Sequence, residues 1–482
     1  MNKKILLGIL LILLILSLST SYIGKKAIES RTGDTIYDKF AQTIPEPIKL
    51  KIKKTFFKSE LLKQEIYLKD KLIDELEKKE NKKNNIILNK YKKLYFKKVY
   101  SDQYKIRDNL LNYSFFQTLY LSNAKNEYAI ASGYLDIFDD KLIVATGDGI
   151  FLKIKLTNLL SNNEFFGEVI NSNFKKIITS KEIFQKSYFG IKDIFINNNK
   201  IFVSYTNQVK ENCFNTGLLV SEINSLKEFK FRKINYSLEC ADKEKMDVSH
   251  GGGRIVSFNK DEILITSGDY YQEEKVQNLD SIFGKILKIN LNNEKYEIIS
   301  YGHRNPQGLK YLKDKKIIIS TEHGPIGGDE INVINLNNDV LDRNYGWPIA
   351  SHGVGSQTNP SSILDYEKKY SSHNDFIEPL KQYTPSIGIS EIITIPNNFI
   401  KSNENQNFFI SSLGLNLSEG DLSLHYIETD NDYKKVVHSQ IIPFQERIRD
   451  IIYSSKLDCF ILFLESDRLF KGGPSISPLC KS

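Results

Sequence analysis

The segments LDIFDDKLIVATG (135–147), RIVSFNKDEILITSGD (254–269) and LKYLKDKKIIISTEHG (309–324) share one pattern. Each begins with an apolar run, passes through a short turn rich in Asp, Asn or Lys, and ends in a second apolar run. This pattern is typical of two antiparallel β-strands joined by a turn. The sequence therefore predicts a β-hairpin in each segment.

Three further segments repeat the hairpin: IKDIFINNNKIFVSYTN (191–207), EIITIPNNFIKSNENQNFFISSLG (391–414) and IRDIIYSSKLDCFILFLE (448–465). The second strands are expected to begin near residues 142, 201, 263, 317, 408 and 460. Repeated β units at mostly about 50 to 60 residues indicate a propeller. A β-sandwich is the competing fold, but it does not account for the regular spacing. We therefore expect an all-β, six-bladed β-propeller over residues 101–482.

The N-terminal segment, residues 1–24, has the pattern of an export signal. Lys3 and Lys4 precede the apolar run ILLGILLILLIL (5–16), and Ser-Thr-Ser (19–21) could serve for cleavage. Extended through Ile23, the run approaches the roughly 20 residues that span a bilayer. A cleaved signal and an uncleaved anchor both stay open, and either predicts a periplasmic or other extracytoplasmic protein, tethered to the inner membrane if the anchor is retained.

Residues 25–100 are of another kind. From Lys54 to Lys98 the chain lacks Gly and Pro, and its apolar residues recur at rough helical spacing. We expect a solvated helical stalk without chemistry of its own, with a short coiled coil as the alternative.

The 482-residue chain carries a net charge of +7, from 66 basic and 59 acidic residues. Many of the lysines fall between Lys49 and Lys98, so the excess does not indicate nucleic-acid binding. The cysteines, Cys213, Cys240, Cys459 and Cys480, are even in number, which in an exported chain favours disulfides. Sequence proximity favours Cys213–Cys240 and Cys459–Cys480 among the three pairings.

Polar phrases flank the hairpins at their open ends. His250, Arg304, Asn305, Arg447 and Arg449 come just before or at the start of a first strand, whereas Asp269 and the run 322–325 follow a second strand. The start of the first strand and the end of the second strand of an antiparallel hairpin meet at one end. These residues should therefore converge in one pocket on one face of the propeller.

A histidine beside an aspartate suits proton abstraction, and arginine forks suit the carboxylates of an anionic ligand. The Gly-Pro phrase with Asp329 and Glu330 suits a hard cation bound through oxygen atoms. Each residue also has a plain structural explanation. A histidine near glycines is more often structural, arginines at strand ends usually pair with acids, and an Asp-Glu turn is usually solvated. Because all of these residues are expected at the same end of the blades, we favour the functional interpretation.

The phrases SHGGGRI (249–255), SGD (267–269), GHRNPQG (302–308), EHGPIGGDEIN (322–332), NYGWP (344–348) and RIRD (447–450) occur in this order. In this order they resemble the glucose/sorbosone dehydrogenase family, over roughly residues 130–465. These are six-bladed propellers, many of which carry pyrroloquinoline quinone (PQQ) and calcium. The resemblance implies oxidation of a sugar or related alcohol, with electrons passed to a downstream quinone or cytochrome.

The resemblance also implies roles for single residues. His250 corresponds to the general base and Asp269 to the aspartate that orients it and contacts substrate. Gln185, in FQKSYFGI (184–191), is similar to a glutamine that contacts substrate or cofactor. The residues implied to hold PQQ are Arg304, Asn305, Arg447 and Arg449. Calcium is implied at the backbone carbonyls of Gly324 and Pro325 or, as in another branch, at Glu330 with the Tyr345 backbone.

Two departures from the family pattern bear on function. The phrase SSLGLN (411–416) has no lysine where soluble members place one against PQQ, and His323 stands where they have glutamine. Some relatives have lost the quinone and serve as binding modules. The alternatives are therefore a cofactor-free propeller that binds carbohydrate or protein, and a calcium-dependent hydrolase of the lactonase type.

Overall fold

The computed structural model describes residues 92–118, 132–161, 163–178, 190–353, 373–400, 406–465 and 475–482, all within the unit Glu80–Ser482. The predicted export segment, residues 25–91 of the predicted stalk, and Gln185 lie outside the described residues. Among the described helices, none is long and apolar enough to cross a membrane.

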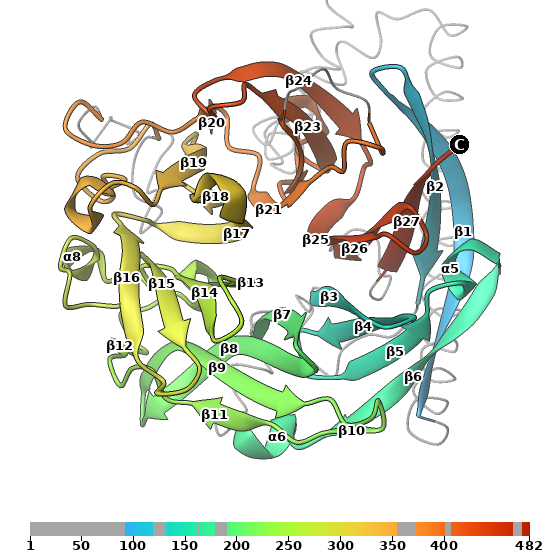
Figure 1. Cartoon of the computed structure of the whole chain (residues 1–482), viewed down its shortest axis with the longest axis horizontal. Helices are drawn as coiled ribbons and strands as arrows, with labels where there is room; N and C mark the ends of the chain where they lie inside the picture. Colours follow the sequence, from blue (N-terminus) through green and yellow to red (C-terminus); the bar gives the residue numbers. More distant parts are fainter. Residues whose placement is uncertain are drawn as a thin grey trace, which may run out of the picture. The chain divides into compact units, whose positions relative to one another are not determined.

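Six short strands form the inner wall of the propeller, one from each blade (Figure 1). Each contacts the next around the ring, and the sixth contacts the first. In chain order they are β3 (Gly133–Phe138), β7 (Ile191–Asn197), β13 (Gly252–Ser257), β17 (Asn305–Leu312), β21 (Ile389–Thr394) and β25 (Arg447–Ser454).

The predicted hairpins are all present in the described chain. Each inner strand pairs antiparallel with the strand that follows it. The second strands begin within two residues of the predicted positions: β4 (Lys141–Thr146), β8 (Lys200–Lys210), β14 (Glu262–Ser267), β18 (Ile317–His323), β22 (Gln406–Ser412) and β26 (Cys459–Glu465).

Outer strands complete the blades: β5 (Phe151–Lys155), β6 (Glu164–Ser172), β9 (Cys213–Glu222), β10 (Glu228–Phe229), β11 (Arg232–Ile234), β12 (Ala241–Asp242), β15 (Lys285–Asn290), β16 (Tyr296–Tyr301), β19 (Asp329–Asn335), β20 (Lys381–Tyr383), β23 (Ser423–Thr429), β24 (Val436–Pro443) and β27 (Ser475–Lys481). Single helical turns occupy some connections: α5 (Asn158–Ser161), α6 (Phe174–Ile177), η1 (Val248–His250), α8 (Glu273–Val276), η2 (Lys313–Lys315), η3 (Val340–Asp342) and η5 (Leu417–Glu419).

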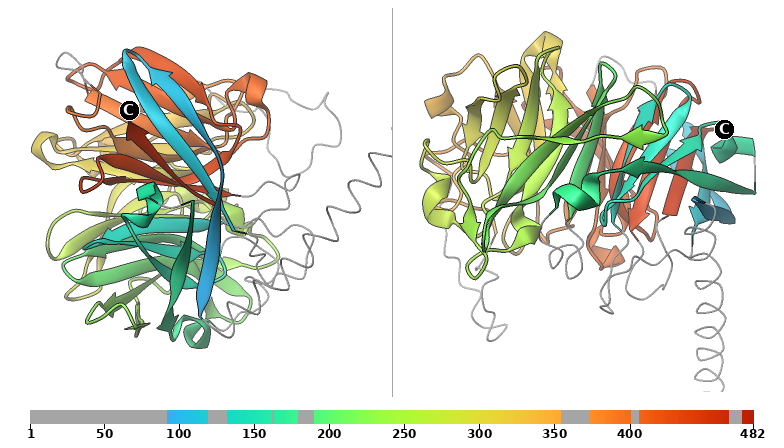
Figure 2. Two further views of the ribbon diagram at one scale, coloured as in Figure 1. Left: turned by 90° about the vertical axis from the view of Figure 1, so that its right-hand side faces the viewer. Right: turned by 90° about the horizontal axis from the view of Figure 1, so that it is seen from below.

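The last blade is completed by a strand from the other end of the propeller sequence. Strand β2 (Asn109–Gln117) pairs antiparallel with β27. Strand β1 (Lys93–Ile106) then pairs with both β2 and β6, which joins the first and last blades into one ten-stranded sheet. Figure 2 shows this strand, in blue, crossing the outside of the ring.

Strand β1 corrects one prediction. Residues 93–100, assigned to the helical stalk, are strand, so the propeller begins before residue 101. The physical reason is an alternation of period two that the lysines conceal. Leu94 and Phe96 are buried against the sheet, whereas Lys93 and Lys97 face solvent.

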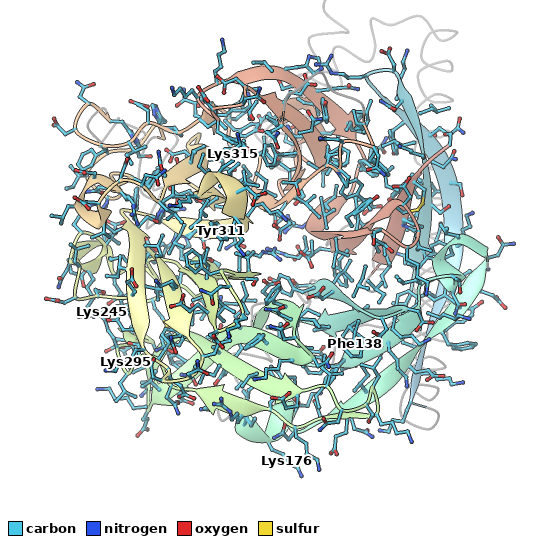
Figure 3. The ribbon with its side chains drawn as sticks, viewed as in Figure 1. Phe138, Lys176, Lys245, Lys295, Tyr311 and Lys315 are labelled. Carbon is cyan, nitrogen blue, oxygen red and sulfur yellow. A yellow bond between two sulfur atoms is a disulfide. The ribbon has the colours of Figure 1, made fainter. Side chains whose placement is uncertain are left out.

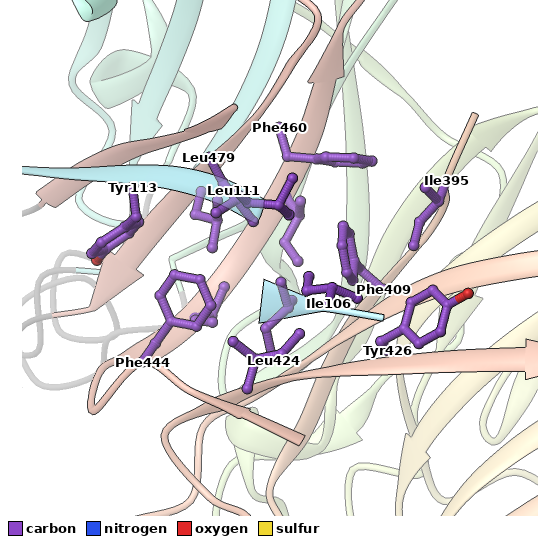
Figure 4. Packing of buried hydrophobic residues seen from close by; sticks show 14 of the residues in the cluster. Ile106, Leu111, Tyr113, Ile395, Phe409, Leu424, Tyr426, Phe444, Phe460 and Leu479 are labelled. Carbon is purple, nitrogen blue, oxygen red and sulfur yellow. The ribbon is translucent and has the colours of Figure 1, made fainter. Parts of the chain in front are cut away.

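Apolar side chains fill the spaces between neighbouring blades. The cluster in Figure 4 brings Ile106 of β1 and Leu111 of β2 against Phe409, Phe460 and Leu479 of the last two blades, all fully buried. Burying a Leu or Phe side chain contributes about 1.5–3 kcal/mol. This cluster therefore holds the closing strands in place through side chains as well as backbone hydrogen bonds.

Acidic residues on three of the inner strands bond to the neighbouring blade. Asp450 accepts from Leu135 N (2.7 Å), Asp136 accepts from Ile196 N, and Asp193 accepts from Ile255 N (2.7 Å). In every case the carboxylate reaches the backbone of the following blade. These bonds link four of the six blades directly.

One arginine on β13 gathers several of these carboxylates. Arg254 Nη1 lies 2.9 Å from Asp193, 2.6 Å from Glu391 and 2.8 Å from Asp450, and Arg254 Nε donates to Gln307 O (3.1 Å). These partners belong to four different blades. We call Arg254, Asp193, Glu391 and Asp450 the channel cluster.

Two disulfides join Cys213 to Cys240 and Cys459 to Cys480, the pairings that sequence proximity favoured. Disulfides are typical of oxidising compartments, so they indicate an extracytoplasmic protein. Figure 3 shows lysines such as Lys176, Lys245 and Lys295 at the rim, where they are exposed.

Candidate functional site

A cavity of about 850 Å³ opens at one end of the blades. Its volume lies within the range of ordinary small-molecule sites, roughly 300–1,000 Å³. The structure brings most of the predicted site residues to its wall, although they are up to two hundred positions apart. Lining residues include His250, Arg304, Asn305, Gly324, Pro325, Arg447 and Arg449.

His250 and Asp269 form a hydrogen-bonded pair in the site. The imidazole Nδ1 lies 3.0 Å from Asp269 Oδ1, and both side chains are buried. Asp269 also accepts from Trp347 Nε1 (2.8 Å) through its other oxygen and from Tyr271 N (3.0 Å). Because the carboxylate is a hydrogen-bond acceptor, His250 Nδ1 keeps its proton and donates to Asp269, and Nε2 of His250 carries the lone pair.

Local backbone geometry explains why Asp269 follows a glycine. Strand β14 ends at Ser267, and the chain then passes directly over the carbonyl of His250. A Cβ atom on Gly268 would lie 1.9 Å from His250 O, closer than any real contact. Glycine therefore permits the close approach that places Asp269 beside the imidazole.

Arg304 covers the other side of His250. Its Nη2 lies 3.3 Å from His250 Nε2, while its Nη1 donates to Gly324 O (2.8 Å) and His323 O (3.2 Å). The guanidinium also stacks over the Trp347 ring at 5.3 Å. Its partners are thus an imidazole, two carbonyls and an aromatic face.

Burial lowers the pKa of His250 below its ordinary value, and the positive charge of Arg304 lowers it further. The hydrogen bond and charge of Asp269 act in the opposite direction but do not outweigh these effects. The imidazole is therefore neutral at physiological pH, which is the state a general base requires.

Arg447 and Arg449 reach the cavity from the start of β25. Glu465, at the end of β26, accepts from Arg449 Nε (2.6 Å) and from Arg447 Nη2 (2.9 Å). Arg449 Nη1 also donates to Gln307 Oε1 (3.2 Å), and Arg447 Nη1 donates to Leu413 O. Two arginines therefore share a single carboxylate, which leaves this wall with a surplus of positive charge.

Burial alone would raise the pKa of Glu465. The charges of Arg449 and Arg447, together with their hydrogen bonds, outweigh burial and lower the pKa to about 2. Glu465 is therefore ionised at any physiological pH.

The two predicted calcium positions differ in their surroundings. Gly324 and Pro325 line the cavity; Gly324 O accepts from Arg304, and Pro325 O accepts from Gly328 N (3.0 Å). Glu330 and Tyr345 are buried and lie outside the cavity lining. The Tyr345 ring stacks on His303 at 4.8 Å, and its hydroxyl donates to Val333 O (2.7 Å).

Four residues of the site were not singled out from the sequence: Trp347, Tyr271, Gln307 and Glu465. Trp347 stands in the NYGWP phrase, yet its bond to Asp269 joins residues from separate blades and has no sequence signal. Glu465 ends an apolar strand, where an acid normally faces solvent. Gln307 lies within GHRNPQG, and that phrase could have identified it.

Sequence comparisons identify relatives of this chain. An uncharacterized protein of Synechocystis sp. is 28% identical over 225 residues, covering 42% of this chain and 50% of that protein. The aldose sugar dehydrogenase of Escherichia coli (strain K12) is 35% identical over 119 residues, covering 22% and 31%. Quinoprotein glucose dehydrogenase B of Acinetobacter calcoaceticus is 32% identical over 129 residues, covering 20% and 26%. The matches span half or less of the length of these relatives.

Solved structures share the fold. A crystal structure of glucose dehydrogenase aligns with a TM-score of 0.56 at 19% identity, covering 72% of this chain and 95% of that one. The PQQ-bound aldose sugar dehydrogenase of Streptomyces coelicolor aligns with a TM-score of 0.50 at 16% identity, covering 79% and 98%. The model of the family described as glucose/sorbosone dehydrogenase matches residues 169–469, more than half of the chain. The chain is a member of the glucose/sorbosone dehydrogenase family.

Proposed function

We propose that this protein is a quinoprotein dehydrogenase that oxidises an aldose or a related alcohol with PQQ and calcium. The observation that carries the proposal is His250, hydrogen-bonded to Asp269, in a cavity that Arg304, Arg447 and Arg449 also line. Relatives named as aldose sugar dehydrogenase and quinoprotein glucose dehydrogenase support the substrate class.

The lining suits the cofactor. PQQ carries three carboxylates, and the cavity offers three arginine side chains and the Asn305 amide as donors. Carbonyl oxygens at Gly324 and Pro325 are the ligand type that calcium prefers. Gly324 O accepts from Arg304 and keeps a second lone pair for a cation. Arg304 Nη2 lies 3.3 Å from His250 Nε2, so the guanidinium must move before a substrate hydroxyl can reach that nitrogen.

The chain's own residues would act on the proton. His250 Nε2 takes the proton of the substrate hydroxyl, and Asp269 stabilises the imidazolium that forms. Trp347 and Tyr271 N keep Asp269 oriented through their hydrogen bonds. PQQ, when bound, would be the oxidant and would accept the hydride from the substrate carbon that carries this hydroxyl. Gln185 remains a proposed substrate contact, and a downstream quinone or cytochrome remains the proposed acceptor.

The test is a titration of the calcium-loaded full chain with PQQ, followed by dye reduction with a panel of aldoses. We expect saturable binding and turnover. His250→Ala should lower kcat by about 10²- to 10⁴-fold with PQQ affinity retained, because the imidazole acts on the proton. His438→Ala, a histidine of β24 away from the cavity, should match the wild type.

The acid side of the pH profile gives a second test. A base must be neutral to act, and the pKa of His250 is lowered from 6.5, so activity should persist below pH 6.5 and fall only as the pH passes the lowered value. If activity already fell on acidification above pH 6.5, the result would contradict the role of His250 as the base.

One observation favours the cofactor-free binding propeller as a second candidate. Gly414 and Leu415 stand where soluble relatives are implied to place a lysine, and the carbonyl of the preceding Leu413 already accepts from Arg447. Absence of PQQ binding at micromolar concentration, together with saturable binding of a sugar, would select this candidate. Lactone hydrolysis that needs calcium but no quinone would select the hydrolase.

A further inference from the structure

Three potential metal ligands meet beside the cavity, on segments well separated in sequence. Glu330 lies near the start of β19, His352 follows the NYGWP phrase, and His373 precedes β20. One ligand atom from each lies within 4.8 Å of the others. Two ligands about 2.1 Å from a tetrahedral ion are about 3.4 Å apart, so a small closure would complete a coordination site.

Hydrogen bonds aim both imidazoles. His373 Nδ1 lies 3.3 Å from Ile377 O, a carbonyl that can only accept, so the ring carries its proton there and its lone pair on Nε2. His373 Nε2 lies 3.8 Å from Glu330 Oε1, beyond hydrogen-bonding distance. His352 Nε2 lies 2.9 Å from Glu378 Oε2, which leaves its Nδ1 as the ligand atom.

These outward bonds have the form found around metal-bound histidines, which donate their second ring N–H to a carbonyl or carboxylate. Glu330 is held in the same way, because its Oε2 accepts from Asn332 Nδ2 at 3.2 Å. The two rings stack at 4.5 Å and 13°, so one imidazole must rotate before the lone pairs of both rings can meet at one ion.

The local charge also favours a cation. Asn332 Nδ2 donates to Glu322 Oε1 as well as to Glu330, both at 3.2 Å, and both carboxylates are buried. The ion pairs described for these two glutamates are with histidines, His303 and His373. Glu322 and Glu330 are also hydrogen-bonded to each other, so without an ion the two buried carboxyl groups share a proton, which a divalent ion would replace.

We propose that Glu330, His352 and His373 form a site for a borderline divalent cation of the zinc type. Two imidazoles and one carboxylate suit zinc, cobalt or nickel, whereas calcium prefers oxygen ligands alone. The arrangement therefore argues against Glu330 as a calcium ligand in this chain. Three protein ligands leave one position for water or an anion.

The site would fix one wall of the cavity. His352 lines the cavity and is partly exposed, whereas Glu330 and His373 are buried behind it. Adjacent Asp329 also lines the cavity, and it accepts from Ile387 N (3.1 Å) and Ile389 N (2.9 Å). A bound ion would thus join three separate segments at the point where the cavity wall begins.

The experiment uses the full chain without PQQ, so its result is independent of the proposed dehydrogenase activity. Chelator-treated protein is titrated with Co²⁺, read by its visible d–d absorption, and then with Zn²⁺ in competition. We expect one equivalent to bind with micromolar or tighter affinity, and a higher thermal midpoint with Zn²⁺. Millimolar Ca²⁺ should not displace the ion.

His352→Gln and His373→Gln should each weaken Zn²⁺ binding at least 100-fold, while His438→Gln, matched in chemistry, should bind as the wild type. If His373→Gln fails to fold, the partly exposed His352→Gln decides the result. The proposal would be overturned if Zn²⁺ binding survived both His352→Gln and His373→Gln. Weak Zn²⁺ binding at a stoichiometry other than one, or displacement of Zn²⁺ by Ca²⁺, would also overturn it.

Discussion

The two arginine clusters at the centre of the propeller have opposite balances of charge. In the channel cluster one guanidinium, Arg254, meets three carboxylates. At the cavity wall Arg447 and Arg449 share one carboxylate of the described residues, that of Glu465, and Arg304 has an imidazole and carbonyls as partners. Arg254 is saturated by its neighbours and holds blades together. The cavity arginines keep donor capacity, so an anionic ligand can complete their bonding.

The largest expected effect comes from removing the cation of the channel cluster. Arg254→Met leaves Asp193, Glu391 and Asp450 buried together without their counter-charge. Breaking a buried ion pair in this way costs about 3–5 kcal/mol. Urea unfolding should show this loss. Arg232→Ala, which breaks an exposed pair with Glu294, is the control, and a similar loss in both variants would refute the distinction.

The second largest effect on stability is expected from acid, through protonation of Glu465 at the cavity wall. The pKa of Glu465 falls from 4.5 unfolded to about 2 folded, so its stabilisation is complete above pH 4.5 and is lost as the pH falls toward 2. The shift corresponds to about 3 kcal/mol. Stability measured from pH 6 to pH 2 should decline less steeply in Glu465→Gln. Parallel curves would contradict the role of Glu465.

A smaller change should weaken ligand binding without unfolding the protein. Arg449→Lys keeps the charge but loses the planar fork that bonds Glu465 and Gln307. We expect PQQ affinity to fall about tenfold, equivalent to about 1.4 kcal/mol. A fluorescence titration measures the affinity. Lys456→Ala, on a turn outside the cavity, is the control.

The smallest effect is predicted for the surface. Arg232 and Glu294 form a pair whose arginine side chain is 59% exposed. Such pairs contribute about 0–1 kcal/mol and are screened by salt. Unfolding of Arg232→Ala should differ from the wild type within that range, and the difference should shrink in 1 M salt. A larger loss of unfolding free energy that did not change with salt would show that this exposed pair stabilises the protein as the buried arginine clusters do.

Most of the architecture could be predicted because turn residues interrupt the apolar runs at regular intervals. The DDK, NNNK and NKDE turns mark hairpins directly, and antiparallel geometry then places His250, Arg304 and Arg449 at one end. Strand β1 was not predicted because its solvent-facing lysines resemble those of a solvated helix.

Contacts between blades could not be predicted from the sequence. The bond of Asp269 to Trp347 joins residues from different blades, and nothing in the local pattern pairs them. Glu330, His352 and His373 likewise lie on three segments whose meeting depends on the tertiary fold.

Closure of the ring through β2 and β27 has a consequence for the order in which the protein folds. During synthesis β2 is made well before β27, yet Leu111 pairs with Lys481 and Gln117 with Ser475. The early strand must wait without its partner until the last blade is complete. Pairings between such distant residues slow folding and leave a strand edge exposed to aggregation in the meantime. The Cys459–Cys480 disulfide cross-links β26 to the late strand, so oxidation helps to secure the surface on which the early strand finally docks.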